Sequence, residues 1–427
     1  MRRLLRERKL EVRIGWVYPH SRFPSADFKL FDALAVVTYE LTRRLARTND
    51  VTVYARRGEG DLPRETRERV EFRRFSQTLD QLLWSLNIVD RLGLTSPSRP
   101  LRMSSLYYRI FAERVARDAA KRRLDVIHIY GTTNFIPVVR RHNPDAVIVL
   151  HSHDHALVDF DPDLTATRLA QASLILGCSE TVTRTMQVRF PALAARCHAL
   201  PNGVDERFFT VASDPAASST VMFVGRLAPE KGVHLLLEAF ARVAADRPEA
   251  RLELIGPRDL SPKQFVDPFG RDPLIASVSA YYKDPDSFRA LLDATARRSG
   301  PQATFRGPIA NDALHGELAR AGVFVFASLW EEPFGIPVIE AMAAGLPVIV
   351  ARSGALPEIV EDGVSGIIVP RGDVAALAQA IDGLLADPSR RAAMGQAARA
   401  RARRHYHWDG CAERLLKLYD SARNRPA

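Results

Sequence analysis

A buried strand, a loop interrupted by glycine and proline, and a helix start follow one another after residue 322. Residues 323–327 are apolar, β-branched and aromatic, as is typical of a fully buried strand. Pro333, Gly335 and Pro337 then exclude regular structure until a helix begins near Pro337, whose missing N–H suits a first helical position. A strand that leads through such a loop into a helix indicates a parallel sheet covered by helices.

The same segment carries groups suited to binding a ligand. Glu332 and Glu340 lie on either side of the loop and start of the helix. The backbone amides of Phe334, Gly335 and Ile336 are expected at the helix N-terminus, where unpaired N–H groups and the helix dipole favour an anion such as a diphosphate. The sequence therefore predicts a phosphate site that holds its ligand without a metal.

At 427 residues the chain is long for one core and natural for two domains of roughly 200 residues each. Apolar runs that alternate with helical or loop stretches predict an α/β fold with two Rossmann-like parallel-sheet domains. The first series comprises strands at 12–17, 50–55, 126–130, 147–151 and 174–178 and a helix at 28–46. The second comprises strands at 221–224, 251–255, 303–306, 323–327, 348–351 and 366–369 and helices at 233–245, 311–321 and 374–385.

These series set the expected domain boundaries. Residues 1–205 form the first domain, residues 220–404 the second, and residues 405–427 a terminal helix. Residues 206–219 end in small and polar side chains, as an interdomain linker should. Residues 257–300 are longer than a strand-to-strand connection needs, and the sequence assigns them no role.

Composition narrows the class of protein. With 46% hydrophobic and 26% charged residues, the chain is that of an ordinary soluble globular protein. Its apolar runs fall short of the roughly 20 residues of a membrane span, and its basic N-terminus has no apolar stretch behind it to make a signal peptide. Cys178, Cys197 and Cys411 are too scattered to suggest disulfides or a zinc site. Cytoplasmic residence is expected.

The net charge of +10 permits anionic partners without choosing among a nucleotide, a nucleic acid and anionic lipid. An arginine-biased solvated surface explains the charge equally well. Residues 100–123 mix aromatic residues and arginines at helical spacing, which with Trp84 and the basic N-terminus suggests peripheral contact with the inner face of a membrane. The alternative is an ordinary amphipathic helix that packs Leu106, Ile110 and Val115 on the core.

Four sequence blocks resemble family 4 of the retaining glycosyltransferases, which have the GT-B fold. Glu332 and Glu340, eight positions apart around Phe-Gly, look like the Glu-x7-Glu signature of this family. Residues 224–232, Val-Gly-Arg-Leu-Ala-Pro-Glu-Lys-Gly, match its Gly-Arg-Leu-x-x-x-Lys-Gly loop, and residues 201–205 and 357–360 match its Asn-Gly-Val-Asp and Pro-Glu-Ile-Val segments. The resemblance implies two domains facing across a cleft, with the last helix crossing back to the first domain.

The resemblance assigns roles to the second domain. Arg226 and Lys231 follow its first strand, and fixed cations there stabilise the charge that grows on a departing diphosphate. Glu340 is expected in the first helical turn, where helix capping alone could explain it, and the resemblance adds a contact with the ribose diol. Glu332, rather than the adjacent Glu331, is expected to face the donor sugar.

Histidines follow a strand of the first domain in the stretch Leu-His-Ser-His-Asp-His at residues 150–155. Clustered histidine and aspartate invite a metal interpretation, but the spacing is one residue short of the familiar binuclear metallohydrolase pattern. The resemblance instead implies a histidine that faces the acceptor and the donor sugar. His153 fits this role best and His151 is the alternate. The stretch 29–35, where family members carry a Gly-Gly pair, has no glycine, so acceptor-binding residues stay unassigned.

The function expected from these residues is transfer of a sugar from a nucleotide diphosphate sugar to an acceptor hydroxyl, with retention of configuration and without a metal or other cofactor. Surface glycan or polysaccharide assembly is the expected setting, and the acceptor is a glycan, a lipid-linked glycan or a small molecule. Two alternatives remain open. One is a nucleotide-sugar 2-epimerase of similar architecture, and the other is a non-catalytic basic scaffold that binds nucleic acid or membrane.

Overall fold

The computed structural model describes residues 12–19, 33–58, 60–77, 80, 95–96, 98–260, 266 and 269–424. The chain divides into two compact units. The first comprises Met1–Cys178, Val182–Leu200 and Cys411–Ala427, and the second comprises Ser179–Thr181 and Pro201–Gly410. The basic N-terminus, Trp84 and the start of the helix predicted at 28–46 lie outside the described residues.

The unit boundary differs from the prediction in detail. The first unit gives way to the second at Leu200 rather than at residue 205, and the expected linker at 206–219 belongs to the second unit. This linker opens with a short helix, α9 (Glu206–Phe209), whose N-terminus is capped by the carboxylate of Asp205, which accepts from the Arg207 amide at 3.0 Å. The terminal residues 411–427 group with the first unit.

The first unit contains an eight-stranded sheet with the order β3-β4-β2-β1-β5-β6-β7-β8. Its strands are β1 (Arg13–Tyr18), β2 (Asp50–Arg56), β3 (Arg64–Arg67), β4 (Val70–Phe75), β5 (Val126–Tyr130), β6 (Val147–Ser152), β7 (Leu174–Gly177) and β8 (Cys197–Ala199). All neighbours pair in parallel except β3 and β4. The central strands are buried along their length, which matches the apolar runs of the sequence.

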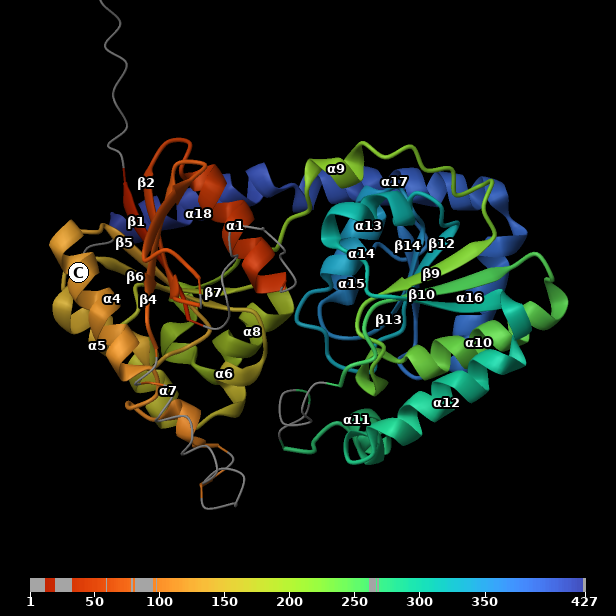
Figure 1. Ribbon diagram of the computed structural model, residues 1–427, viewed down its shortest axis with the longest axis horizontal. Helices are drawn as coiled ribbons and strands as arrows, with labels where there is room; N and C mark the ends of the chain where they lie inside the picture. Colours follow the sequence, from red (N-terminus) through yellow and green to blue (C-terminus); the bar gives the residue numbers. More distant parts are fainter. Residues whose placement is uncertain are drawn as a thin grey trace, which may run out of the picture. The chain divides into compact units, whose positions relative to one another are not determined.

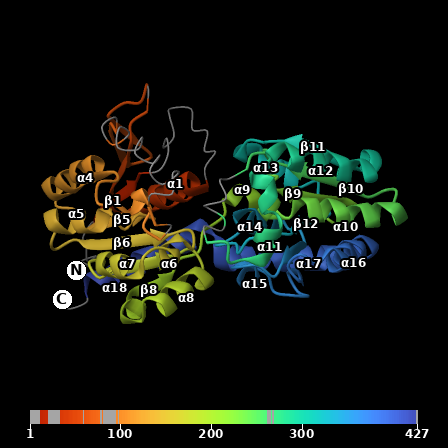
Figure 2. The ribbon, with the colours of Figure 1, turned by 90° about the horizontal axis from the view of Figure 1, so that it is seen from below.

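Helices cover this sheet on both sides, with α4 and α5 side by side on one and α1 on the other (Figures 1 and 2). The helices are α1 (Ala33–Leu45), α4 (Arg109–Arg122), α5 (Phe135–His142), α6 (Ala156–Asp159), α7 (Pro162–Leu169), α8 (Glu180–Arg189) and α18 (Trp408–Arg423). Among the helices of the described residues, none combines the length and the apolar character needed to cross a bilayer.

The second unit contains a six-stranded, all-parallel sheet with the order β11-β10-β9-β12-β13-β14. Its strands are β9 (Thr220–Val224), β10 (Arg251–Ile255), β11 (Ala303–Gly307), β12 (Val323–Phe326), β13 (Val348–Ala351) and β14 (Gly366–Val369). This is the strand order of a doubly wound Rossmann sheet. The α/β prediction with two parallel-sheet units is therefore confirmed.

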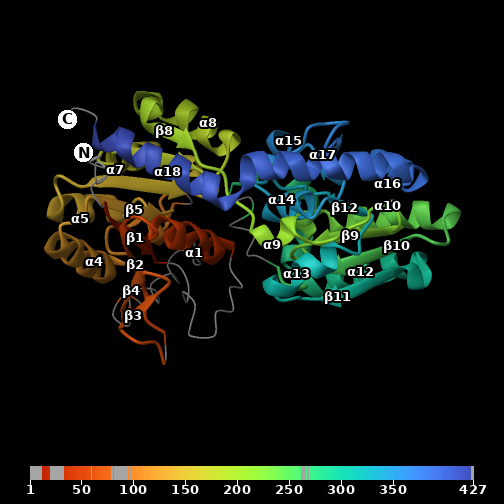
Figure 3. The same cartoon turned by 90° about the horizontal axis from the view of Figure 1, so that it is seen from above.

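The helices of the second unit follow its strands in the expected order, with α10 and α12 side by side (Figure 1). They are α10 (Val233–Asp246), α11 (Pro273–Ser277), α12 (Pro285–Arg298), α13 (Asn311–Leu318), α14 (Ile336–Ala343), α15 (Leu356–Ile359), α16 (Val374–Ala386) and α17 (Pro388–Tyr406). Figure 3 shows α16 and α17 succeeding one another along this unit.

Three arginines of α17 cap the carboxyl ends of other helices. Arg391 donates to two carbonyl oxygens in the last turn of α16 at 2.7 Å, Arg399 to the C-cap carbonyl of α14 at 2.6 Å, and Arg401 to the last carbonyl of α15 at 2.7 Å. Carbonyl groups at helix ends lack intrahelical partners and carry the negative end of the dipole, so a guanidinium satisfies them well. These arginines belong to the framework and not to a solvated surface.

Candidate active site

The strand order of the second sheet reverses between β9 and β12. Ligands of open parallel sheets bind at such a reversal, just beyond the carboxyl ends of the strands. The loop after β9 holds Arg226 and Lys231, and the loop after β12 holds Glu332. Three of the residues singled out from the sequence therefore follow the two strands that flank the reversal.

A glycine brings these two loops into contact. Gly232 directly follows Lys231 and has a φ of +67°. A Cβ atom at this position would lie 2.0 Å from the carbonyl oxygen of Ala327, so only glycine fits. The close approach places Lys231 Nζ 2.6 Å from Glu332 Oε1.

The Lys231–Glu332 pair is well buried, with side-chain exposures of 11% and 5%. Ser328 Oγ donates to the same carboxylate oxygen at 2.6 Å, and the ammonium group lies 4.7 Å from the centroid of the Trp330 ring. The Oε2 atom of Glu332 makes no hydrogen bond with a described residue. The ammonium is thus held in one orientation, because its counter-ion is itself anchored.

The structure separates the two adjacent glutamates. Glu331 is half exposed, and its carboxylate pairs with Arg371 and accepts from the Gly354 amide. Glu332 points into the interior, and its carbonyl oxygen accepts from the Ala355 amide at 2.8 Å. Between the two candidates, it is Glu332 that meets Lys231, as the Glu-x7-Glu spacing favours.

The loop after Glu332 ends at the N-terminus of α14. Its N-cap, Gly335, has a φ of 123°, and Pro337 is the second residue of the helix, which begins one position earlier than predicted. The amides of Phe334, Gly335 and Ile336 donate to no described residue. A row of unpaired N–H groups at the start of a helix is suited to bind an anion.

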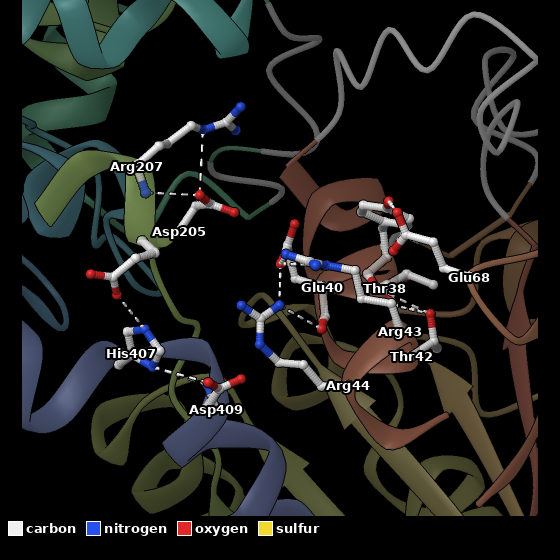
Figure 4. A network of polar contacts seen from close by, with 12 residues as sticks. Thr38, Glu40, Thr42, Arg43, Arg44, Glu68, Asp205, Arg207, His407 and Asp409 are labelled. Carbon is white, nitrogen blue, oxygen red and sulfur yellow. Dashed lines mark hydrogen bonds and ion pairs between the residues drawn. The ribbon is translucent and has the colours of Figure 1, made fainter. Parts of the chain in front are cut away.

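Glu340 lies at the fifth position of α14 and not in its first turn, so the helix-capping explanation is wrong. Its side chain is buried, and burial raises the pKa of its carboxyl to about 8, with Arg207 opposing and Asp205 reinforcing the shift. Figure 4 shows the contact between Asp205 and Arg207. Arg207 also donates a hydrogen bond to Asn311 Oδ1 at 2.8 Å. A buried carboxyl of this kind gains from a ligand that donates hydrogen bonds to it.

Glu230, which no sequence pattern marks as a site residue, has a completely buried side chain. One carboxylate oxygen, Oε1, lies 2.9 Å from Arg226 Nη2, and the other, Oε2, accepts from the Tyr282 hydroxyl at 2.8 Å. Glu230 occupies a variable position of the Gly-Arg-Leu-x-x-x-Lys-Gly loop, so the motif does not mark it. Its partner Tyr282 is 52 positions away, and a contact at that separation has no local sequence signal.

Three histidines of the first unit, the buried His128 and His151 and the partly buried His153, lie together and are called the histidine cluster. His128 Nδ1 lies 2.7 Å from the Tyr419 hydroxyl, and its Nε2 lies 3.2 Å from Nδ1 of His151. The rings of His151 and His153 are 4.1 Å apart between centroids. Burial lowers the pKa of all three, to about 3 for His153, so they are neutral at pH 7.

The surroundings of the histidine cluster do not favour the metal interpretation of residues 150–155. The described residues contain no group of three or more His, Cys, Asp or Glu side chains arranged to hold a metal ion. His151 packs inward and His153 follows the end of β6. Of the two candidates, His153 is the less buried, and it belongs to the first unit, whereas all other predicted site residues belong to the second.

Two family models match the chain in succession. The model described as Glycosyltransferase Family 4 matches residues 34–208, and that described as Glycosyl transferases group 1 matches residues 206–401. Among similar proteins, the Bacillus subtilis spore coat protein SA is 26% identical over 73% of this chain and 82% of its own length. The Acidothermus cellulolyticus D-inositol 3-phosphate glycosyltransferase is 28% identical over 91% of this chain and 85% of its own.

Solved structures share the fold over almost the whole chain. The sucrose-phosphate synthase of Thermosynechococcus elongatus superposes with a TM-score of 0.68 at 21% identity, over 96% of this chain and 99% of its own. Anabaena Alr3699/HepE in complex with UDP gives 0.66 at 18% identity, over 96% and 100%. The two family models and the similar glycosyltransferase support sugar transfer rather than the epimerase or the non-catalytic scaffold. The chain belongs to family 4 of the glycosyltransferases, the retaining enzymes with the GT-B fold that its Glu-x7-Glu spacing indicated.

Proposed function

We propose that the loops after β9 and β12 bind the diphosphate of a nucleotide sugar, which the enzyme uses to glycosylate an acceptor hydroxyl. The observation that supports this most is the meeting of an oriented ammonium group, Lys231, with the carboxylate of Glu332 at the reversal of a Rossmann sheet. The free amides at the start of α14 extend the same edge of the sheet. An anion held there has both fixed charge and backbone donors.

Each residue then has a role. Arg226 and Lys231 stabilise the negative charge that grows on the departing diphosphate, more in the transition state than in the ground state. The amides of Phe334, Gly335 and Ile336 hold phosphate oxygens. Glu340 accepts hydrogen bonds from the ribose hydroxyls, which relieves its burial.

The sugar moves with retention of configuration. Glu332 orients the donor sugar through its second oxygen, and His153, a neutral imidazole after β6, is the proposed contact of the sugar or the acceptor. The acceptor oxygen attacks on the face that the nucleotide leaves. The sugar–phosphate bond breaks as the glycosidic bond forms, and a departing phosphate oxygen takes the acceptor proton. Because Arg226 and Lys231 carry the positive charge, the transfer needs no metal.

The acceptor is proposed to be a glycan precursor or a lipid-linked one. Other proteins similar to this chain are a phosphatidyl-myo-inositol mannosyltransferase and a lipopolysaccharide 1,2-N-acetylglucosaminetransferase. Leu106, which the core-packing alternative would bury, is 56% exposed, whereas Val115 is fully buried. The exposed leucine lies near the start of residues 100–123, which mix aromatic residues and arginines, and it favours peripheral contact with anionic lipid.

The test is donor turnover by a Lys231→Ala variant. UDP-, GDP- and ADP-sugars are screened by calorimetry, and turnover of the donor that binds is measured in EDTA. Removal of one fixed charge from a transition state costs about 10²–10³ in rate, so Lys231→Ala should lose that factor while its far-UV spectrum stays unchanged. The control is Lys417→Ala, which removes an exposed lysine of α18. Near-normal turnover by Lys231→Ala, or a product of inverted configuration, would contradict the proposal.

A further inference from the structure

The stretch between β10 and β11, to which the sequence assigned no role, folds onto the donor loops. Its described part includes α11, the 3₁₀ turn η6 (Ser279–Tyr282) and α12. We call residues 269–298 the cap segment. Its apolar side chains Ile275 and Val278 form one cluster with Leu329 of the loop after β12, and Trp330 packs against the same cluster. The ring that faces Lys231 is therefore supported by the cap segment.

A second contact joins the cap segment to the loop after β9. The Tyr282 hydroxyl, at the end of η6, donates to Glu230 Oε2 at 2.8 Å. The main-chain oxygen of Glu230 accepts from the Leu329 and Trp330 amides at 2.8 and 3.1 Å. Glu230 thus connects both donor loops and the cap segment, through its backbone on one side and its carboxylate on the other.

A third contact reaches the Glu-x7-Glu loop. Asp272 caps the N-terminus of α11, and its carboxylate pairs with Arg371 at 2.8 Å. Arg371 also pairs with Glu331, the neighbour of Glu332. The cap segment is therefore attached by an apolar cluster and by two polar contacts to the loops that carry Arg226, Lys231 and Glu332.

The contact at Glu230 determines how Arg226 is held. A fully buried carboxylate must be paired on both oxygens, because an unpaired charge in the interior is costly. Tyr282 occupies Oε2, so Arg226 reaches only Oε1, at 2.9 Å and without hydrogen-bond alignment. The Nη1 atom of Arg226 is buried and has no hydrogen-bond partner among the described residues. The guanidinium is thus held on one side by Glu230, while its Nη1 group lacks an acceptor and the side chain as a whole is 32% exposed.

Without the tyrosine hydroxyl, both oxygens of Glu230 would be free for Arg226. An arginine and a carboxylate prefer a bidentate fork, in which two N–H groups face two oxygens. Such a fork would draw the guanidinium onto Glu230 and engage the N–H groups that a phosphate needs. The hydroxyl prevents this, because it satisfies one oxygen with a neutral donor.

We propose that Tyr282 is a positioning residue for nucleotide binding, which acts through Glu230 to keep Arg226 open toward the diphosphate, and that the cap segment exists to present it. This inference rests on the role proposed above for Arg226. It assigns the cap segment a part in substrate binding, although Tyr282 itself touches no substrate.

The test is a double-mutant cycle measured by calorimetry with the nucleoside diphosphate, among UDP, GDP and ADP, that binds the unaltered protein most tightly. Tyr282→Phe removes only the hydroxyl and is expected to weaken binding about three- to tenfold, the loss of one charge-assisted contact. The matched control is Tyr281→Phe. Tyr281 belongs to the same apolar cluster, and its hydroxyl bonds to no described residue. Affinity in the control should stay within about twofold of the unaltered protein.

The second arm repeats Tyr282→Phe in an Arg226→Ala background. If Tyr282 acts through Arg226, it has no further effect there, and the measured coupling equals its whole effect. The same loss in both backgrounds would indicate a general loosening of the loops and overturn the inference, as would unchanged affinity of Tyr282→Phe. If Arg226→Ala alone binds nucleotide normally, the proposed role of Arg226 fails and the inference fails with it.

Discussion

Replacement of Glu340 by glutamine is expected to stabilise the protein. Burial raises the pKa of this carboxyl from an ordinary 4.5 to about 8. A carboxyl whose pKa is higher in the folded state than in the unfolded state favours the folded state least at high pH. The resulting loss of free energy of unfolding is absent below the pKa of the unfolded state. It grows with pH until the pKa of the folded state is passed. Glutamine has nearly the same shape and no proton to lose, so it removes the cost.

The magnitude follows from the distance between the working pH and the unfolded pKa. At pH 7 this distance is about 2.5 pH units, and at about 1.4 kcal/mol per unit the carboxyl lowers the free energy of unfolding by about 3 kcal/mol. At pH 5 the same reasoning gives less than about 1 kcal/mol. The gain on substitution is therefore expected to be small at pH 5 and large at pH 7.

The assay is urea unfolding of the full chain at both pH values, followed by circular dichroism. The matched control is Glu238→Gln on α10, which removes a partly exposed carboxylate that pairs with Arg242. This variant should show no gain that grows with pH. A difference between Glu340→Gln and the unaltered protein that is independent of pH, or a loss of stability at pH 7, would refute the reasoning.

The same variant tests the ribose contact. A carboxylate that accepts hydroxyl hydrogen bonds contributes about 1.5–3 kcal/mol, so Glu340→Gln should bind nucleoside diphosphate about tenfold or more weakly. Between pH 7 and 9 the unaltered protein should bind more tightly as Glu340 ionises. The variant should lose that dependence. A more stable protein with undiminished nucleotide affinity would remove Glu340 from the site while leaving the account of its burial intact.

Two further outcomes are expected of the first unit. At low salt the chain should sediment with vesicles that contain anionic lipid and not with neutral vesicles. Leu106→Glu should weaken this binding about fivefold. Equal sedimentation with both kinds of vesicle would contradict membrane contact. Because the histidine cluster is held neutral, protonation of the unfolded chain below its usual pKa of about 6.5 favours unfolding as pH falls. A histidine with a folded pKa near 3 then costs about 2 kcal/mol at pH 5. Urea unfolding followed by the fluorescence of Trp16, which stacks on His128 at 3.8 Å, should shift to lower urea between pH 7 and 5, and an unchanged midpoint would contradict a neutral cluster.

The sequence patterns predicted best the strands that are covered on both faces of a sheet. The strands β5 and β13, which are buried along their length, have the ends that their apolar runs predict, because strands covered on both faces must be apolar throughout. By contrast, β3 reads Arg-Glu-Thr-Arg, a charged edge strand, and β8 has only three residues. Neither has an apolar run, so no periodicity marks them. Edge strands are selected for charge rather than for burial.

The candidate site divides in the same way. Lys231 and Glu332 were found because short motifs hold them at fixed spacing after strands, and the structure brings them together. Glu340 was predicted as a site residue, but its burial was not predicted, because a position on a helix does not by itself reveal burial. Tyr282 was not found at all. Its contact depends on how a long insertion folds back, and such tertiary contacts override local patterns.

The arginine caps give α14 an unusual pair of properties. Its carboxyl end is fastened by Arg399, whose guanidinium stays protonated where Glu340 titrates, although burial lowers the pKa of Arg399. Glu340, in the middle of the same short helix, exchanges its proton near pH 8. The middle of this helix therefore changes its charge with pH, while the contact that holds its carboxyl end does not. If Glu340 binds the ribose as proposed, pH would change the affinity for the nucleotide while the position of the helix stays fixed.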